Sequence, residues 1–454
     1  MMEKYDVIVI GNGVGGHVAL NAAEEGEKTA LVDRAPVGGT CQNFGCKPSK
    51  LLIHTADRLK QSKTLSEDGI DFRVKDIDFG EIMDDLRNTR ERWQEEQKEV
   101  ILSKENLDYF ETECRFTDEY TLETEDTVLH GEKIFIAAGA RPFIPPIEGL
   151  NEIEYLTNES ILELETLPEK LVIIGGGYIG VEYAHFMSEM GTEVTIMQRG
   201  DRLVKNQDKD ISNFLEQKLS ERMEVALNTE ASRVKKESKG YTVEGKTEEE
   251  EEIFFYGDKV LVAVGREPNT DTLDLEKTGV STDDHGYIKV NDHLETSKED
   301  IWALGDITGR GMFKHVANLE ADFAWHNSKN DDKKKMDYDS VPNAVFTDPK
   351  MASVGMTESE ARKEKDVLIG KAQYEDVIKG MLTKSRGFAK AVVEKESQKL
   401  LGFHIIGPEA PILLQETVDV IADDGTVKDV TKGIHTFPTL SRVITAALED
   451  LKSD

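Results

Sequence analysis

The chain has 454 residues, 38% of them apolar, which is enough for about two or three globular domains with sizeable cores. Its formal net charge of -33 repels nucleic acid and anionic membrane surfaces, so we expect neither as a partner. No apolar run is long enough to span a bilayer or to form a secretory signal, and three cysteines are too few for a disulfide-stabilised secreted scaffold, so we expect a cytoplasmic protein.

The chain opens with a predicted strand at residues 5–10, a glycine-rich turn and a helix at 17–25. The turn has three glycines at the spacing of a dinucleotide-binding loop: Gly11, Gly13 and Gly16. The first permits the tight turn, the second lets the backbone approach a pyrophosphate, and the third lets the helix pack closely on the strand. The next predicted strand, 28–32, ends in Asp33, whose carboxylate is placed to accept hydrogen bonds from a ribose.

Two cysteines follow this fold, with four residues between them. Cys41 and Cys46 come directly after Gly39 and Thr40, and a close cysteine pair beside a nucleotide fold indicates redox catalysis. We therefore expect the pair to close as a reactive disulfide. Cys46 begins a predicted helix, and the helix dipole together with nearby lysines predicts a lowered pKa for its thiol.

A long charged stretch, 79–106, has apolar residues at near-helical spacing and predicts a helical excursion of the first fold. Farther along, two predicted strands end in Gly139 and Gly265, where the chain can pass from one nucleotide domain to the next. A short strand at 301–305 leads into Asp306, whose carboxylate is placed to bind a second chain of cofactor hydroxyl groups.

The dinucleotide motif occurs a second time after a predicted strand at 171–174. Its glycines repeat the first spacing: Gly175, Gly177 and Gly180. The following strand, 193–197, ends in Gln198 rather than in a carboxylate, and Arg199 and Lys205 come next. Two cations at this position complement a 2'-phosphate, which favours NADPH over NADH.

In chain order, the sequence thus presents two glycine fingerprints and three further segments: Gly39-Thr40-Cys41 through Cys46-Lys47-Pro48-Ser49-Lys50, Gly305-Asp306, and Val345-Phe346-Thr347-Asp348-Pro349. This order resembles that of the flavoprotein disulfide reductases, which include glutathione reductase, mycothione reductase, dihydrolipoamide dehydrogenase and mercuric reductase. The resemblance covers nearly the whole chain, and the cysteine motif is its most specific part.

The resemblance implies an α/β fold with two Rossmann-like domains and a C-terminal α+β dimerisation domain. It implies FAD in the first fold, NADPH in the second with NADH as the alternative, and a homodimer whose sites are built by two chains. The implied domains are 1–148 and 271–340 for FAD, 149–270 for the nicotinamide nucleotide, and 341–454 for dimerisation.

The resemblance also implies roles for individual residues. Lys50 and Glu182 are expected to pair near flavin N5, and Tyr178 is expected to cover the empty nicotinamide pocket. Electrons would pass from NADPH through FAD to the disulfide and then to a small thiol disulfide, with Cys46 next to the flavin and Cys41 as the nucleophile. No metal ligands are expected.

The C-terminal motif departs from the family pattern. The family has a histidine before Pro-Thr and an acid five residues later, where this chain has Phe437 and Arg442. A phenyl ring cannot exchange a proton, so Phe437 cannot act as a general acid or base. General acid–base catalysis typically contributes about 10²- to 10⁴-fold in rate. His435, two positions away, is a candidate for either a catalytic or a structural role.

Three functions remain open from the sequence. The first is an NADPH-dependent reductase of a low-molecular-weight disulfide. The second is dihydrolipoamide dehydrogenase, which would run in the reverse direction with NAD, and against which Arg199 and Lys205 argue. The third is an electron-transfer flavoprotein that reduces mercuric ions or quinones, for which the missing base at Phe437 would matter little.

Overall fold

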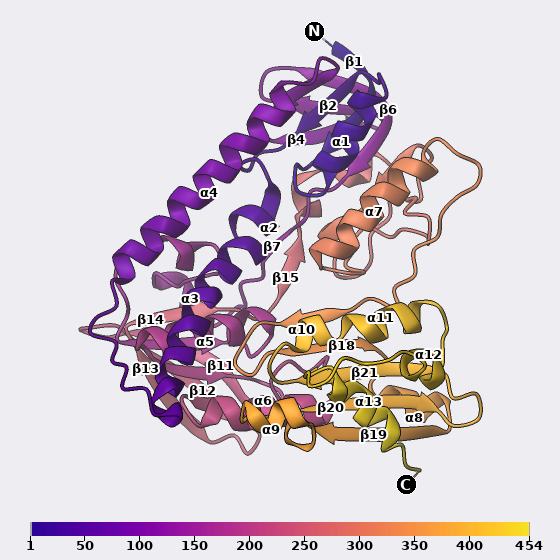
Figure 1. The fold of residues 1–454 in the computed structure, drawn as a ribbon. Helices are drawn as coiled ribbons and strands as arrows, with labels where there is room; N and C mark the ends of the chain where they lie inside the picture. The colour runs from indigo at the N-terminus through magenta and orange to yellow at the C-terminus, as the bar shows by residue number, and fades with distance from the viewer. Residues whose placement is uncertain (1, 454) are drawn as a thin grey trace.

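The first nucleotide fold is built on a seven-stranded sheet (Figure 1). In the computed structural model, which describes residues 2–453, its strand order is β3-β2-β1-β6-β5-β4, and β16 pairs with β6. The strands are β1 (Met2–Ile10), β2 (Thr29–Val32), β3 (Leu107–Phe110), β4 (Cys114–Asp118), β5 (Thr121–Thr124), β6 (Val128–Ile136) and β16 (Ile301–Ala303). β1 lies parallel to both β2 and β6, so the carboxyl ends of these central strands meet at one edge.

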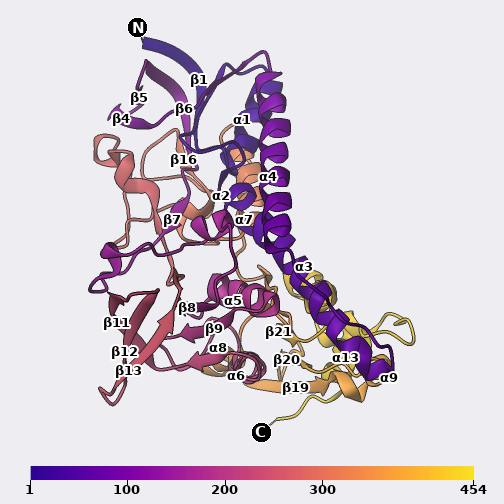
Figure 2. The same cartoon turned by 90° about the vertical axis from the view of Figure 1, so that its left-hand side faces the viewer.

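Five helices belong to this part of the chain: α1 (Gly15–Glu24), α2 (Gly39–Asn43), α3 (Cys46–Thr64), α4 (Phe79–Leu102) and α7 (Lys314–Asn327). Helices α1 and α7 share a buried cluster with β1 that includes Val9, Val18 and Trp325. Figure 2 shows α4 along the outer side of the fold and α3 continuing below it toward the second fold. The charged stretch predicted to be helical is α4, whose first turn is capped by the Asp78 carboxylate.

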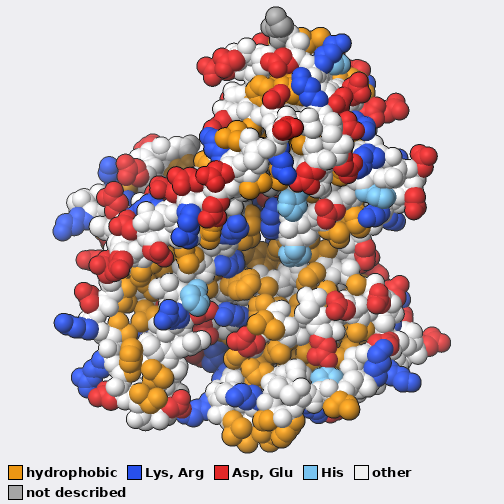
Figure 3. Space-filling model, turned by 45° about the horizontal axis from the view of Figure 1, so that its top comes forward, with side chains coloured by type: hydrophobic (Ala, Val, Ile, Leu, Met, Phe, Trp, Pro, Cys, Tyr) orange, Lys and Arg blue, Asp and Glu red, His pale blue; other side chains and the backbone are white. Residues whose placement is uncertain are grey.

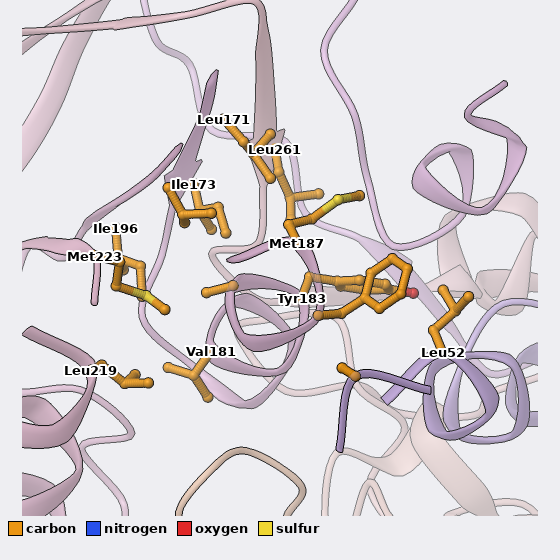
Figure 4. Close-up of a cluster of buried hydrophobic side chains, with 14 of the residues drawn as sticks. Leu52, Leu171, Ile173, Val181, Tyr183, Met187, Ile196, Leu219, Met223 and Leu261 are labelled. Carbon is orange, nitrogen blue, oxygen red and sulfur yellow. The ribbon is translucent and has the colours of Figure 1, made fainter. Parts of the chain in front are cut away.

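The second nucleotide fold has a parallel sheet of order β10-β9-β8-β14 and an antiparallel sheet of order β11-β12-β13. Its elements are β8 (Lys170–Ile174), α5 (Tyr178–Met190), β9 (Glu193–Met197), α6 (Lys209–Ser220), β10 (Glu224–Ala226), β11 (Thr229–Lys236), β12 (Tyr241–Thr247), β13 (Glu252–Gly257) and β14 (Lys259–Val262). Figure 4 shows the core between α5 and β8, where Leu52 of α3 joins side chains such as Ile173 and Tyr183. Helix α3 is therefore packed against both nucleotide folds.

Two short strands connect the nucleotide folds. β7 (Ala140–Pro142) follows Gly139, β15 (Arg266–Pro268) follows Gly265, and the two pair in antiparallel register. The chain thus leaves and re-enters the first fold side by side, at the two glycines where the sequence predicts the crossings.

The C-terminal part has an antiparallel sheet of order β17-β18-β21-β20-β19. Its elements are β17 (Asn343–Val345), β18 (Met351–Gly355), α8 (Glu358–Glu364), β19 (Val367–Gln373), α9 (Ile378–Leu382), β20 (Phe388–Glu394), β21 (Leu400–Ile406), α10 (Ala410–Leu413), α11 (Gln415–Ala422), α12 (Val427–Thr431) and α13 (Arg442–Glu449). Thr357 and Glu360 form a capping box at the start of α8. The predicted fold class is confirmed, whereas the domain boundaries stay predictions.

Between residues 2 and 453, none of the helices combines the length and the apolar character that a bilayer crossing needs.

Candidate redox-active site

The cysteine pair lies against the first dinucleotide turn because of Gly39. Gly39 has a φ of +62°, and a Cβ on it would lie 2.4 Å from Gly13 Cα. Only glycine allows α2 to approach the turn this closely. Cys41 lies within α2 and Cys46 is the first residue of α3, so both thiols are held beside the turn.

The two thiols are free and hydrogen-bonded to each other, which is the reduced state of the predicted disulfide. The hydrogen bond from Cys46, together with Lys314 and Lys47, lowers the pKa of Cys41 to about 6, against the effect of burial. The same hydrogen bond and burial raise the pKa of Cys46. The sequence-based prediction of a lowered pKa for Cys46 is therefore wrong for this state, because Cys46 donates the shared proton and lies near Glu182.

Lys314 is a site residue that the sequence analysis did not single out. It begins α7, and its Nζ donates to the carbonyl oxygen of Gly13 at 3.4 Å. Burial lowers the pKa of Lys314, while the Cys41 thiolate favours its charged form. The signal in the sequence is weak, because a lysine at the start of a helix is usually a solvated surface residue.

Lys50 and Glu182 pair as the resemblance implies. Lys50 Nζ lies 2.6 Å from Glu182 Oε2, and the Glu182 side chain is 8% exposed. The other oxygen of Glu182 accepts a hydrogen bond from the backbone N–H of Phe346 at 3.0 Å, and Lys50 also lies over the Phe346 ring. Glu182 therefore connects the cysteine helix, the second nucleotide fold and the C-terminal unit.

The first dinucleotide turn has unused polar groups at its centre. Asn12 is fully buried, and among the described residues its side chain has only a weak contact with the Tyr109 hydroxyl, outside ordinary hydrogen-bond geometry. Asp33 accepts hydrogen bonds from the backbone N–H of Asn12 at 2.6 Å and of Ala35 at 2.9 Å, and burial raises the pKa of its carboxyl group. Buried amide atoms that are free to bind a ligand, next to a carboxylate at the position that binds ribose hydroxyls, fit a bound dinucleotide.

One glycine role in this turn differs from the prediction. A Cβ on Gly15 would lie 2.7 Å from the Val9 side chain of β1, whereas a Cβ on Gly16 would meet Asn12 Oδ1 at 2.6 Å. Gly15, rather than Gly16, therefore allows the close packing of helix on strand, because α1 starts at Gly15 and turns that residue toward β1.

Asp306 and Arg266 form a second group of polar residues in the first nucleotide fold, apart from the dinucleotide turn. Burial raises the pKa of the Asp306 carboxyl group, and Arg266 Nε lies 3.6 Å from its Oδ2. Gly139 and Gly265 stand in open space, with no atom within 4 Å of a Cβ built on either. These residues leave room for a ligand between the crossing strands and Asp306.

The second dinucleotide turn repeats the geometry of the first. Its glycines are Gly175, Gly177 and Gly180, and a Cβ on Gly177 would meet no atom within 4 Å. Gln198 Oε1 accepts from the N–H of Gly176 at 2.9 Å, as Asp33 does in the first fold. Arg199 is 77% exposed with one ion pair to Glu230 at 3.4 Å, and Lys205 is exposed, so both cations are accessible to a phosphate.

Tyr178 lies between the two nucleotide folds. It is the first residue of α5, and its ring packs edge-on against Phe313, with ring centroids 6.0 Å apart. Its hydroxyl accepts a hydrogen bond from Gln207 at 2.9 Å.

On the face shown in Figure 3, a hollow in the middle of the molecule is bordered by Lys, Arg and His side chains.

His435 is not joined by any hydrogen bond or ion pair to the cysteine site within residues 2–453 of one chain. Its side chain is 10% exposed, its Nε2 lies 2.5 Å from Glu416 Oε1, and its Nδ1 contacts the Gly433 carbonyl. Phe437 is 70% exposed. The catalytic role of His435 stays a prediction.

Comparison with known proteins places the chain among flavin-dependent reductases. The family model described as pyridine nucleotide-disulphide oxidoreductase matches residues 5–321, and the model of its dimerisation domain matches 341–448. The chain is 32% identical to mercuric reductase of Staphylococcus aureus, covering 96% of this chain and 80% of that protein. It is 33% identical to dihydrolipoyl dehydrogenase of Haloferax volcanii (98% and 96% covered) and 32% identical to mycothione reductase of Mycobacterium tuberculosis (99% and 100% covered).

A similar solved structure is the HOCl-induced flavoprotein disulfide reductase RclA from Escherichia coli, determined as a Cu(II) complex. It superimposes with a TM-score of 0.88 at 26% identity, covering 99% of both chains.

Proposed function

Because the chain belongs to the pyridine nucleotide-disulphide oxidoreductase family, we propose that it uses NADPH to reduce a small thiol disulfide at Cys41 and Cys46. The family's enzymes use FAD and NAD(P)H, and the dimerisation domain supports a homodimer. The observation that carries the proposal is the hydrogen-bonded thiol pair, with its lowered pKa at Cys41, next to a dinucleotide turn.

The residues around Asn12, Asp33 and Asp306 would hold FAD, which when bound supplies two-electron transfer between a nicotinamide and a disulfide. Lys50 and Glu182 would orient the reacting groups, since their ion pair is largely buried. The second turn, with Arg199 and Lys205, would hold the nicotinamide nucleotide and its 2'-phosphate.

The cysteines would then carry out thiol–disulfide exchange. The Cys41 thiolate attacks one sulfur of the substrate disulfide, which forms a mixed disulfide and releases the first thiolate. Cys46 then attacks the sulfur of Cys41 and gives up its proton, which releases the second thiolate and leaves a Cys41–Cys46 disulfide. The substrate gains two electrons and the cysteine pair loses two. The position of the thiolate on Cys41 supports this order of attack.

Reduction of a metal ion is the second candidate. The residue at the family's proton-exchanging position is Phe437, which is exposed and cannot act as a base. Relatives include mercuric reductases, and RclA has been determined as a Cu(II) complex. Binding of a soft metal ion by two thiolates needs no base at Phe437.

An anaerobic titration of the purified protein with NADPH and with NADH tests the proposal. We expect NADPH to reduce the bound flavin and the cysteine pair, and turnover to follow with a low-molecular-weight disulfide rather than with Hg(II), Cu(II), a quinone, or dihydrolipoamide plus NAD. In Arg199→Glu, kcat/KM should fall about 10- to 100-fold with NADPH and much less with NADH, as expected for the loss of one charge-assisted contact. Turnover with metal ions alone would move the function to the second candidate, and equal losses with both nucleotides would remove the NADPH assignment.

A further inference from the structure

Gln207 lies where the second nucleotide fold meets the C-terminal unit. It is 3% exposed and follows Arg199 and Lys205 in the segment that leads from β9 to α6. Its Nε2 donates to the Tyr178 hydroxyl at 2.9 Å and to Asn343 Oδ1, and its Oε1 accepts from Ser353 Oγ at 2.6 Å. Both donor positions and the acceptor oxygen of this amide therefore have partners, which fixes its orientation.

The segment that carries Gln207 is itself held on the second dinucleotide turn. Val204 N–H donates to the Gly176 carbonyl at 2.8 Å, and the N–H of Gln207 donates to the Val204 carbonyl at 2.9 Å. Val204 is buried and has a φ of 45°, which is unfavourable for a β-branched residue. Backbone strain of this kind persists only where the surroundings enforce it, and it is concentrated at functional positions.

The Tyr178 ring links the second dinucleotide turn to the segment that begins α7. Tyr178 follows Gly177 of the second turn, and its ring packs on Phe313, the residue before Lys314. Lys314 in turn reaches the Gly13 carbonyl of the first turn. The family resemblance implies that this ring covers the nicotinamide pocket, so a nicotinamide that extends from the second turn toward the cysteines would displace the ring.

We propose that Gln207 is a positioning residue that latches Tyr178 in its closed position, so that entry of the nicotinamide breaks the Gln207–Tyr178 hydrogen bond. The latch is anchored on the C-terminal unit, because Asn343 and Ser353 belong to β17 and β18. The inference rests on the proposed function, since it requires that a nicotinamide nucleotide binds at the second turn.

A latch reduces the apparent affinity for the whole dinucleotide by the fraction of molecules that are open. It has no effect on a fragment that binds the second turn and lacks nicotinamide. One hydrogen bond changes the open fraction by about three- to tenfold. A variant that changes the affinity for the whole dinucleotide but not for the fragment has therefore lost the latch. A variant that weakens binding of both ligands has a damaged site.

The test uses titration calorimetry of the FAD-loaded protein with NADP+ and with 2'-phosphoadenosine diphosphate ribose, which lacks nicotinamide. In Gln207→Leu and in Tyr178→Phe, we expect NADP+ to bind about three- to tenfold more tightly and the fragment to bind as in the parent. The double variant should match the single variants, because both remove the same hydrogen bond.

Gln217→Leu is the matched control, because Gln217 is an exposed residue of α6 in the same fold. We expect it to bind both ligands as the parent does. The latch is overturned if Gln207→Leu and Tyr178→Phe bind NADP+ no more tightly than the parent, or if their effects add. If the parent binds neither NADP+ nor NAD+, the proposed function fails and the latch with it; if NADPH reduces the parent but the variants are unchanged, only the latch is wrong.

Discussion

The charge on Cys41 depends on residues from several elements. Cys46 of α3 donates its proton toward Cys41, and the cations Lys47 and Lys314 lie near enough to lower its pKa to about 6. Cys114, by contrast, is half-buried near acidic groups that include Asp33, and desolvation raises its pKa to about 12. The chain thus contains a reactive thiol and an inert thiol that can be compared in one experiment.

We expect iodoacetamide to modify Cys41 in the reduced protein with a rate that rises through about pH 6 and levels off above it. The sign follows because the thiolate is the reactive form and a lowered pKa means that it is present above pH 6. Lys314→Met should move the midpoint upward, because it removes a cation. Mass spectrometry of the labelled peptides measures this, with Cys114 as the internal control that stays unmodified below about pH 9. A midpoint for Cys41 near the ordinary thiol value of about 8.5 would contradict the prediction.

At the scale of elements, α3 and α5 are joined along their lengths by three ion pairs and one histidine–carboxylate contact. The ion pairs are Lys50–Glu182 at 2.6 Å, Lys63–Glu189 at 2.8 Å and Lys60–Glu189 at 3.7 Å, and the histidine contact is His185–Asp57 at 3.0 Å. The cysteines precede the first pair, and Tyr178 begins the helix on the other side. The relative position of the cysteines and the nucleotide turn therefore depends on these contacts as well as on the apolar core.

Glu189→Ala should destabilise the protein by about 3 kcal/mol, the usual cost of removing one partner of a buried ion pair. Glu189 is 4% exposed, and its loss leaves the largely buried Arg222 guanidinium, 2.7 Å away, without its carboxylate partner. Burial acts to raise the pKa of Glu189, but Lys63, Arg222 and Lys60 lower it overall. A carboxyl group with a lowered folded-state pKa stabilises the protein above its unfolded pKa, so the difference from the parent should shrink below about pH 4.

Urea unfolding followed by circular dichroism measures this difference at pH 7 and at acidic pH. Glu193→Ala is the control, because Glu193 is 70% exposed and pairs with Lys170 on the surface. Its unfolding midpoint should match that of the parent. Equal midpoints for Glu189→Ala and the parent at pH 7 would show that the ion pairs of Glu189 do not stabilise the fold.

The sequence predicts those elements whose signals are local. Both dinucleotide turns and the strand at β9 follow from glycine spacing and from continuous apolar runs. Strand β19 was missed, because its sequence, Val367–Gln373, mixes glycine, lysine and glutamine with its apolar residues. Contacts such as Gln207–Tyr178 and His435–Glu416 join residues that lie far apart in the sequence, so no spacing rule could predict them.

The thiol pKa values show the same limitation within the site. A helix start with nearby lysines predicts a lowered pKa for Cys46, and that inference uses only neighbours in sequence. The structure adds Glu182 near Cys46 and Lys314 near Cys41, from elements more than 100 residues away. The negative charge of Glu182 disfavours a thiolate on Cys46 and the positive charge of Lys314 favours one on Cys41, so both help to place the thiolate on Cys41.

At the scale of the whole molecule, a strongly acidic chain also presents apolar side chains to solvent. Six large apolar residues of the C-terminal unit are between 45% and 104% exposed: Ile378, Met381, Leu382, Ile412, Ile434 and Phe437. They belong to the region that matches the dimerisation domain. Association of two copies would cover such residues, but each copy carries a net charge of -33, and the two charges repel.

We therefore expect Leu382→Asp and Ile412→Asp to shift the protein from dimer to monomer, because each places a charge in an apolar contact surface. Light scattering coupled to size-exclusion chromatography measures the mass at about 0.05 M and 0.5 M salt. The parent should associate more tightly at the higher salt, since the screening length falls from above about 10 Å to a few ångströms. Phe254→Asp is the control, because Phe254 is 55% exposed on β13 and lies outside the dimerisation region. If both variants remain dimers at both salt concentrations, Leu382 and Ile412 lie outside the interface, and the apolar exposure of the C-terminal unit has another cause.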